Sequence, residues 1–422
     1  MSTPVTSEPS LNRPDDVVVT GLGAVSAFGW GAELLARGLT KGSTTLVPPE
    51  RFDTQGHRTH LASEVPTRQA PADPGVPRSR ADAFAVVAGG EALEQAGLTA
   101  DDLHRLGPAV GLFFGGSTAG MDQAEHYFTR LRGMAEGRPL LRFLVSHQLN
   151  APADAIARRF GIQGPVDTVS SACASGGLAL GAAVDALRDG EVEVALAGGS
   201  DALCQLTYAG FNALRAVDVE PCRPFRGDRE GLGLGEGAGV LVLETARHAS
   251  ARGARPIARV LGSGASCDSH HMTAPHPQGE GAAEAIRRAL ADAGVAPADV
   301  TFVNAHGTGT PHNDIAEWRA LEAVFGPRAA EIPVTSTKGV VGHLLGSSGA
   351  IEAVATVQSL SSGAIHPTPG EGPPDPAMEV DLVLGSPRPI ATPAVAVSTS
   401  FAFGGSNAAV VFGSAPGGDP SR

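Results

Sequence analysis

The sequence predicts an α/β protein built in layers. Short runs of β-branched and other apolar residues alternate with alanine-rich stretches of helical character along most of the chain. The apolar runs are nearly continuous, so we expect strands that are covered on both faces. With 422 residues, 42% of them hydrophobic and 18% charged, the chain is long enough to bury a large core.

The elements follow in order along the chain. Residues 1–15 are polar and contain several prolines, so we expect them to be disordered. Apolar runs predict strands at residues 16–23, 109–116, 192–199, 239–244, 300–307 and 394–403. Alanine-rich stretches predict helices at residues 80–97, 176–190, 281–294, 314–325 and 349–360. A glycine turn follows a strand both early and late in the chain, which is compatible with two similar halves.

Composition excludes several classes of function. No stretch of about 18 apolar residues is present, nor a basic segment followed by an apolar one at the start, so we expect a cytoplasmic protein. A net charge of −13 argues against nucleic acid or an anionic membrane as partner, but it does not exclude an acidic protein. The four cysteines lack CxxC spacing and the histidines are loosely placed, so we expect neither disulfides nor a metal site.

One cysteine stands where a turn runs into a helix, in the segment SSACASGGLALGAAVDAL at residues 170–187. The start of a helix presents unpaired N–H groups and the positive end of its dipole, and both lower the pKa of a thiol. We therefore expect Cys173 to be a nucleophile at the start of a central helix whose small residues fit a crowded interior. A buried structural cysteine is the alternative, because free cysteines are often buried.

Two histidines favour a nucleophilic role for Cys173 over a structural one. His306 follows an apolar strand on a glycine-threonine turn, and the next helix contains Asp314 and Glu317. His343 lies five residues after Lys338 and is expected to open another helix. A cysteine at a helix start with two histidines at strand or turn ends forms a nucleophilic set.

Four motifs, VSSACASG, NAHGTGT, KGVVGHLLGSSGA and SFAFGGSNA, occur here in the order seen in the β-ketoacyl-acyl-carrier-protein synthases, and from about residue 16 to residue 413 the sequence resembles that family. The resemblance implies a thiolase-like fold, with two similar halves in a five-layer α-β-α-β-α arrangement and a five-stranded sheet in each half. It places the N-terminal half with the cysteine at residues 16–255, the C-terminal half with the histidines at 256–413 and a flexible tail at 414–422.

The resemblance also implies the chemistry. An acyl group held on Cys173 would condense with malonyl-acyl carrier protein, with loss of CO2, in fatty-acid, polyketide or polyene elongation. His306 and His343 would be the catalytic histidines, and Lys338 would form a supporting ion pair with Glu317. The backbone N–H groups of Cys173 and Phe403 would form the oxyanion hole, worth roughly 10²- to 10³-fold in rate per donor.

Further residues are implied with less weight. Phe403 stands where the family has a movable phenylalanine, and the glycines that begin at Gly404 would let that loop move. The candidates for substrate binding are Gly404 and, along the pantetheine arm of the carrier protein, Thr308, Thr310, His271 and Thr273. For the threonines, turn capping is the alternative. No bound cofactor is expected, since phosphopantetheine arrives on the carrier protein.

The carrier protein is strongly acidic, so an acidic synthase needs a local basic face. By resemblance, the candidates for carrier docking are Arg78, Arg80, Arg138, Arg142 and Arg215; scattered solubilising arginines are the alternative.

Other functions remain to be weighed. A thiolase would need a second catalytic cysteine late in the chain, and no cysteine follows Cys267. A chain-length partner of a heterodimeric synthase characteristically lacks the nucleophile. A non-elongating acyltransferase would be favoured by the loss of one histidine, and both are present. The sequence leaves open whether the enzyme is a homodimer or the active half of a heterodimer with a chain-length partner.

Overall fold

A computed structural model describes residues 16–67, 79–133 and 141–415, except for the side chain of residue 142. The predicted disorder of residues 1–15 lies outside these ranges. All six predicted strands and all five predicted helices are present in the structure. Within the described ranges, no helix has both the length and the hydropathy to cross a membrane.

The strands form two groups that meet at a short join. The first group, in spatial order, consists of β1 (Val17–Ser26), β6 (Gly237–Thr245), β5 (Val194–Asp201), β3 (Val110–Gly115) and β4 (Val166–Val169). The second consists of β7 (Ala258–Cys267), β14 (Ser406–Ser414), β13 (Val395–Phe401), β8 (Phe302–Asn304), β9 (Pro333–Thr335) and β11 (Asp381–Leu382). Antiparallel pairing of Val17–Val19 on β1 with Ala258–Val260 on β7 joins the groups into one continuous sheet.

Each group places parallel strands at its outer side. In the first group β3 pairs in parallel with β4 and β5, and in the second group β8 pairs in parallel with β9 and β13. The strands nearest the join, β1, β6, β7 and β14, pair antiparallel with their neighbours. Short strands lie beside this sheet, namely β2 (Gly29–Trp30), which pairs with β1, and a separate pair, β10 (Ala364–Ile365) and β12 (Arg388–Pro389).

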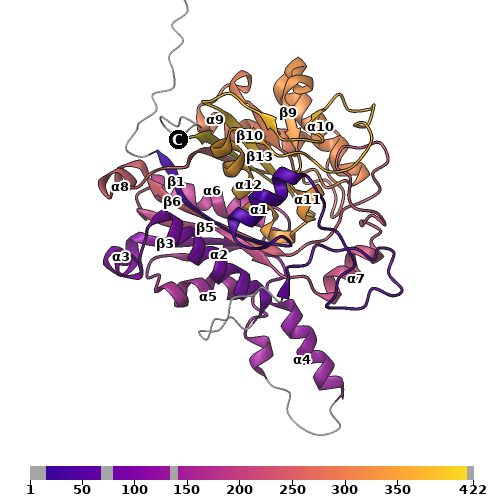
Figure 1. The fold of residues 1–422 in the computed structure, drawn as a ribbon. Coiled ribbons are helices and arrows are strands. Elements are labelled where there is room, and N and C mark those ends of the chain that lie inside the picture. Colours follow the sequence, from indigo (N-terminus) through magenta and orange to yellow (C-terminus); the bar gives the residue numbers. More distant parts are fainter. Residues whose placement is uncertain (1–15, 68–78, 134–140, 416–422) are drawn as a thin grey trace, which may run out of the picture.

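Helices complete five layers (Figure 1). Outer helices α2 (Arg80–Ala96), α3 (Ala100–Leu106) and α5 (Ala151–Phe160) accompany the first group, with α2 packed on β1 and β6. The outer helices of the second group are α9 (Glu280–Ala293), which packs on β7 and β14, and α10 (Pro311–Phe325). Between the groups lie α6 (Ser175–Arg188) and α12 (Ser348–Ser362), which contact strands of both. This is the five-layer order that the resemblance implies.

The remaining helices are α1 (Ala32–Lys41), α4 (Met121–Gly133), α7 (Gln205–Ala213), α8 (Ala246–Ala251) and α11 (Lys338–Val341), of which α11 is buried. The apolar core has one cluster between the two strand groups, one under each outer helix layer and a smaller one around Tyr208 of α7. Strand β14 continues through Ser414, which is buried and bonded to the backbone of Ala394, so the predicted tail cannot begin at residue 414. Residues 416–422 lie outside the described part, and the predicted domain boundary at residues 255 and 256 stays a prediction.

Candidate active site

The candidate site lies where loops follow the carboxyl ends of β4, β8 and β13, a common location for sites in α/β folds. Cys173 comes four residues after β4 and two before α6, and it is buried. The turn that carries it is strained, because Ala172 has a φ of 45°, a value that non-glycine residues rarely adopt. The Ser175 hydroxyl holds the turn closed: it accepts the Ser171 N–H at 2.8 Å and donates to the Ala172 carbonyl at 2.7 Å.

Burial dominates the acidity of the Cys173 thiol. It raises the pKa to about 11, although the positive charge of Lys338 and hydrogen bonds from the backbone N–H groups of Phe403 and Cys173 act in the opposite direction. The expected lowering by the helix N-terminus is therefore wrong for the resting site, because desolvation of the thiolate outweighs these donors. The two N–H groups at the sulfur are those that the resemblance implies for an oxyanion hole.

His306 follows β8 and is held in a defined tautomer. Its backbone N–H donates to Glu317 Oε1 and to Thr399 Oγ1, each at 2.9 Å. Its Nδ1 lies 3.0 Å from the ammonium group of Lys338, which has only protons to donate, so Nδ1 accepts and Nε2 carries the ring proton. Burial and the nearby charge of Lys338 lower the pKa of His306 well below 6.5, so the ring is neutral at pH 7.

His343 is held in the same tautomer by different groups. It lies between α11 and α12, two residues past the end of α11, rather than opening a helix as predicted. Its Nδ1 accepts the Leu345 N–H at 3.0 Å, so Nε2 again carries the proton. Burial lowers the pKa of His343 well below 6.5. The rings of His306 and His343 are nearly perpendicular, with centroids 5.5 Å apart.

The predicted ion pair between Lys338 and Glu317 is wrong. Lys338 pairs instead with Glu352 of α12, and both side chains are about 1% exposed. Glu317 binds the backbone N–H groups of His306 and Gly307, together with the Thr399 hydroxyl. Burial raises the pKa values of Glu317 and Glu352 each to about 7.

Sequence reasoning missed Glu352, although a signal was present: it is the one charged residue in the predicted helix GAIEAVATVQSL. It also missed the segment that clamps His343. The His343 N–H donates to the Gly233 carbonyl at 2.6 Å, and the His343 carbonyl accepts the Gly235 N–H at 2.9 Å. That glycine-rich segment leads directly into strand β6.

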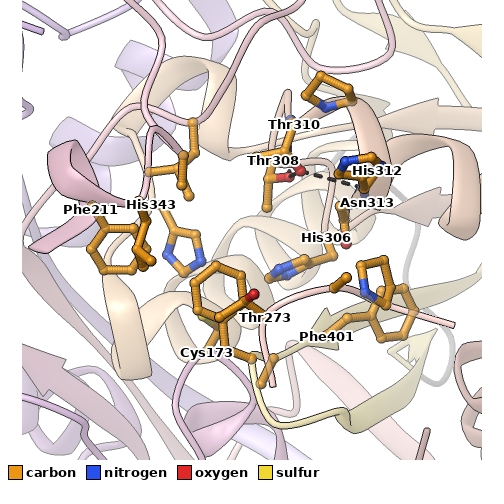
Figure 2. Close-up of a pocket in the computed structure, with 18 of the residues that line it drawn as sticks. Cys173, Phe211, Thr273, His306, Thr308, Thr310, His312, Asn313, His343 and Phe401 are labelled. Atoms are coloured by element: carbon orange, nitrogen blue, oxygen red, sulfur yellow. Dashed lines mark hydrogen bonds between the residues drawn. The ribbon is translucent and has the colours of Figure 1, made fainter. Parts of the chain in front are cut away.

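A pocket of about 410 Å³ connects these groups to the surface (Figure 2). Cys173, His306 and His343 lie at its inner part, and Phe403 lines it with its ring stacked on Phe211 of α7, the centroids being 5.9 Å apart. The next residue, Gly404, is exposed with a φ of 87°, a conformation suited to glycine. The predicted aromatic residue at the pocket therefore lies on a glycine turn.

The predicted pantetheine residues are distributed unevenly. Thr308, Thr310 and Thr273 line the pocket, and the hydroxyls of Thr308 and Thr310 are 2.8 Å apart. Thr310 is also the N-cap of α10, so the capping alternative holds for it alongside any binding role. His271 is exposed, and its Nδ1 accepts the Thr273 N–H at 3.1 Å.

The structure separates the candidate docking arginines. Arg215 is exposed and lines the pocket. Arg80 is not available for docking, since its guanidinium forms an ion pair with fully buried Glu236 and its side chain is 15% exposed. Arg78 and Arg138, as well as the side chain of Arg142, lie outside the described residues.

A thiol on a strained turn, two neutral histidines and a deep pocket define a class of thiol-dependent acyl-transfer enzymes. Comparison with known proteins gives the family. Residues 14–249 match the model of the beta-ketoacyl synthase N-terminal domain, and residues 257–370 match that of the C-terminal domain. The chain belongs to the β-ketoacyl synthase family.

Similar proteins agree over nearly the whole length. Nodulation protein E of Rhizobium leguminosarum bv. trifolii is 38% identical, with 94% of this chain and 98% of that protein covered. The 3-oxoacyl-[acyl-carrier-protein] synthase 2 of Synechocystis sp. is 36% identical, with 94% and 97% covered. A solved structure, the ishigamide ketosynthase/chain length factor, is 36% identical with a TM-score of 0.88, and 95% of this chain and 99% of that chain are covered. These matches confirm the thiolase-like fold.

Proposed function

We propose that the protein catalyses the decarboxylative condensation of an acyl group held on Cys173 with malonyl-acyl carrier protein. The products are β-ketoacyl-acyl carrier protein and CO2, formed in the elongation of a fatty-acid, polyketide or polyene chain. The observation that carries this proposal is the pair of neutral histidines whose Nδ1 atoms both accept hydrogen bonds, which leaves two Nε2–H donors in a pocket that also contains a thiol.

The first half-reaction loads the enzyme. The Cys173 sulfur attacks the thioester carbon of an acyl-carrier protein, and the bond to the pantetheine sulfur breaks. Cys173 loses a proton in this step, and the departing pantetheine sulfur takes one up to become a thiol. The N–H groups of Cys173 and Phe403 bind the tetrahedral oxyanion, and each such donor is typically worth roughly 10²- to 10³-fold in rate.

The second half-reaction forms the carbon–carbon bond. Malonyl thioester loses CO2, and the electron pair of the broken bond makes an enolate whose oxygen accepts hydrogen bonds from His306 and His343. The enolate carbon attacks the acyl carbonyl on Cys173 and expels the thiolate, which takes up one proton. Loss of CO2 generates the carbanion without a strong base, so the histidines are needed as hydrogen-bond donors and not as bases.

The substrates and partners follow from the same proposal. Phosphopantetheine enters as the arm of the carrier protein, with Thr308, Thr310 and Thr273 along its path and Arg215 at the pocket. We expect the enzyme to act in the cytoplasm and to pair either with a second copy or with a chain length factor. The similarity to the ishigamide ketosynthase/chain length factor supports the second arrangement.

Intact-protein mass spectrometry tests the proposal. Wild type and Cys173→Ala are incubated with acyl-carrier protein, and malonyl-carrier protein is then added. We expect an acyl mass increment on wild type only, which disappears as β-ketoacyl-carrier protein forms. Discharge of the acyl group without extension would make the protein a non-elongating acyltransferase. If no increment forms with several acyl groups, alone or with a chain length factor, the assignment of Cys173 is wrong.

A further inference from the structure

The last residue of β5, Asp201, is fully buried and binds two loops at once. From the loop after β3, the backbone N–H groups of Ser117, Thr118 and Ala119 donate to its carboxylate at 2.8 to 3.0 Å. From the loop between His343 and α12, the Gly346 N–H donates to Oδ2 at 2.7 Å. A single carboxylate therefore ties the loop after β3 to the loop that follows a catalytic histidine.

The second loop is held in an unfavourable conformation. Leu345 has a φ of 55°, a conformation that a non-glycine residue keeps only where its surroundings impose it. In this conformation the Leu345 N–H points at His343 Nδ1, 3.0 Å away. The next N–H, that of Gly346, is fixed by Asp201 Oδ2 and by Ser117 Oγ at 3.1 Å. These anchors fix the peptide between Leu345 and Gly346, and through Leu345 they restrain the preceding peptide, whose N–H selects the tautomer of His343.

We propose that Asp201, together with Ser117, is a positioning residue for the condensation step. It acts through Gly346 and Leu345 to aim the Nε2–H of His343 into the pocket, and it touches no reacting atom. The inference rests on the proposed function, because it assumes that His343 stabilises the enolate. Among the described residues, the Asp201 bonds run to residues 117–119 and 346 and not to the turn that carries Cys173, so loading of the cysteine should not need them.

Two neighbouring hydroxyls offer a matched pair of variants. Ser117 Oγ donates to Asp201 at 3.0 Å and also accepts the Gly346 N–H. Thr118 Oγ1 donates to the same carboxylate at 3.0 Å, but it has no bond to the His343 loop. Ser117→Ala and Thr118→Val each remove one donor to Asp201, and only the first removes a contact to Gly346. Asp201→Asn is the stronger variant.

The two half-reactions are measured separately in single turnovers, as acyl loading of Cys173 and as condensation of the preloaded enzyme. We expect Ser117→Ala to slow condensation about tenfold and Asp201→Asn about 10²-fold, as for displaced catalytic groups, with loading changed less than about twofold. Thr118→Val should leave both steps within about twofold of wild type.

Equal slowing of both steps in Ser117→Ala, or equal behaviour of Ser117→Ala and Thr118→Val, would overturn the inference and make Asp201 a purely structural residue. If Asp201→Asn does not fold, the Ser117 and Thr118 variants decide the question. A wild-type enzyme that loads but never condenses would instead overturn the proposed function, so the two failures are distinguishable.

Discussion

At the scale of single residues, the chemistry explains why a cysteine occupies position 173. A thiol is a suitable receiver for an acyl group that arrives as a thioester, because the exchange replaces one thioester with another at little cost. Its location after a strained turn brings the sulfur to two backbone N–H groups. The sequence correctly indicated a cysteine near a helix start, but it did not reveal that burial of the thiol outweighs the helix end and so decides its acidity.

The pH dependence of alkylation tests that acidity. Because the thiolate reacts, and the pKa of Cys173 is raised to about 11, we expect its rate with iodoacetamide to rise about tenfold per pH unit from pH 7 to 10 without a plateau. Peptide mass spectrometry follows Cys173 and, as an internal control, exposed Cys267 in the same sample. A plateau at Cys173 by pH 8 would show that the helix and Lys338 outweigh burial.

At the scale of elements, the partner of Lys338 is selected by the packing of helices and not by distance along the sequence. Glu317 on α10 and Glu352 on α12 are both plausible partners for Lys338 by residue type. The central helix α12 places Glu352 beside the ammonium group of Lys338, whereas α10 places Glu317 beside the backbone N–H of His306. The choice depends on how helices pack across the two strand groups, and no local pattern encodes it.

A pair of isosteric variants tests the corrected pairing. Glu352→Gln leaves a buried ammonium without its counter-charge, which we expect to lower the free energy of unfolding by about 3–5 kcal/mol. Glu317→Gln disturbs only accepted hydrogen bonds, with an expected loss of about 1–3 kcal/mol. Urea denaturation at pH 8, above both raised pKa values of about 7, gives the comparison. The opposite order would restore the pairing with Glu317.

The small residues of the central helices provide a second test at this scale. Gly349 of α12 lies against α6, and a Cβ placed there would approach the Gly177 nitrogen to 2.6 Å. We expect Gly349→Ala to cost about 1–3 kcal/mol through overpacking. Gly181→Ala on α6 is the control, since its Cβ would meet only the Ser263 side chain at 3.1 Å, and it should be neutral or stabilising by up to about 1 kcal/mol. Equal melting temperatures for the two variants would contradict this close helix crossing.

At the scale of the whole molecule, much of the architecture was predictable because buried strands and central helices leave strong local patterns. All the strands predicted from continuous apolar runs are present, but β4, β7, β9 and β14 are among those that were missed; in β7, with the sequence ARVLGSGASC, glycine and serine interrupt the apolar run. The resemblance predicted that Cys173, His306 and His343 share one site. The structure adds the tautomers of the two histidines. The structural role of Arg80 could not be predicted, since its partner Glu236 is 156 residues away.

The charge of the whole molecule frames the last prediction. A protein of net charge −13 repels an acidic carrier at long range, so docking must depend on local cations near the pocket. Arg215 is exposed at the pocket that leads to Cys173. We expect Arg215→Glu to raise the KM for acyl-carrier protein by about tenfold at low salt, and less at high salt because ions screen exposed charges.

Comparing acyl donors of different size distinguishes an effect on carrier docking from an effect on the chemical step. A small acyl-pantetheine thioester lacks the carrier surface, so Arg215→Glu should load from it at close to the wild-type rate. The control is Arg158→Glu on α5, the same charge change at a side chain that is 70% exposed and does not line the pocket. If both variants weaken carrier binding equally, only net charge matters. If Arg215→Glu slows loading from both donors alike, Arg215 shapes the pocket rather than the docking surface, because only a docking residue distinguishes a donor that carries a protein from one that does not.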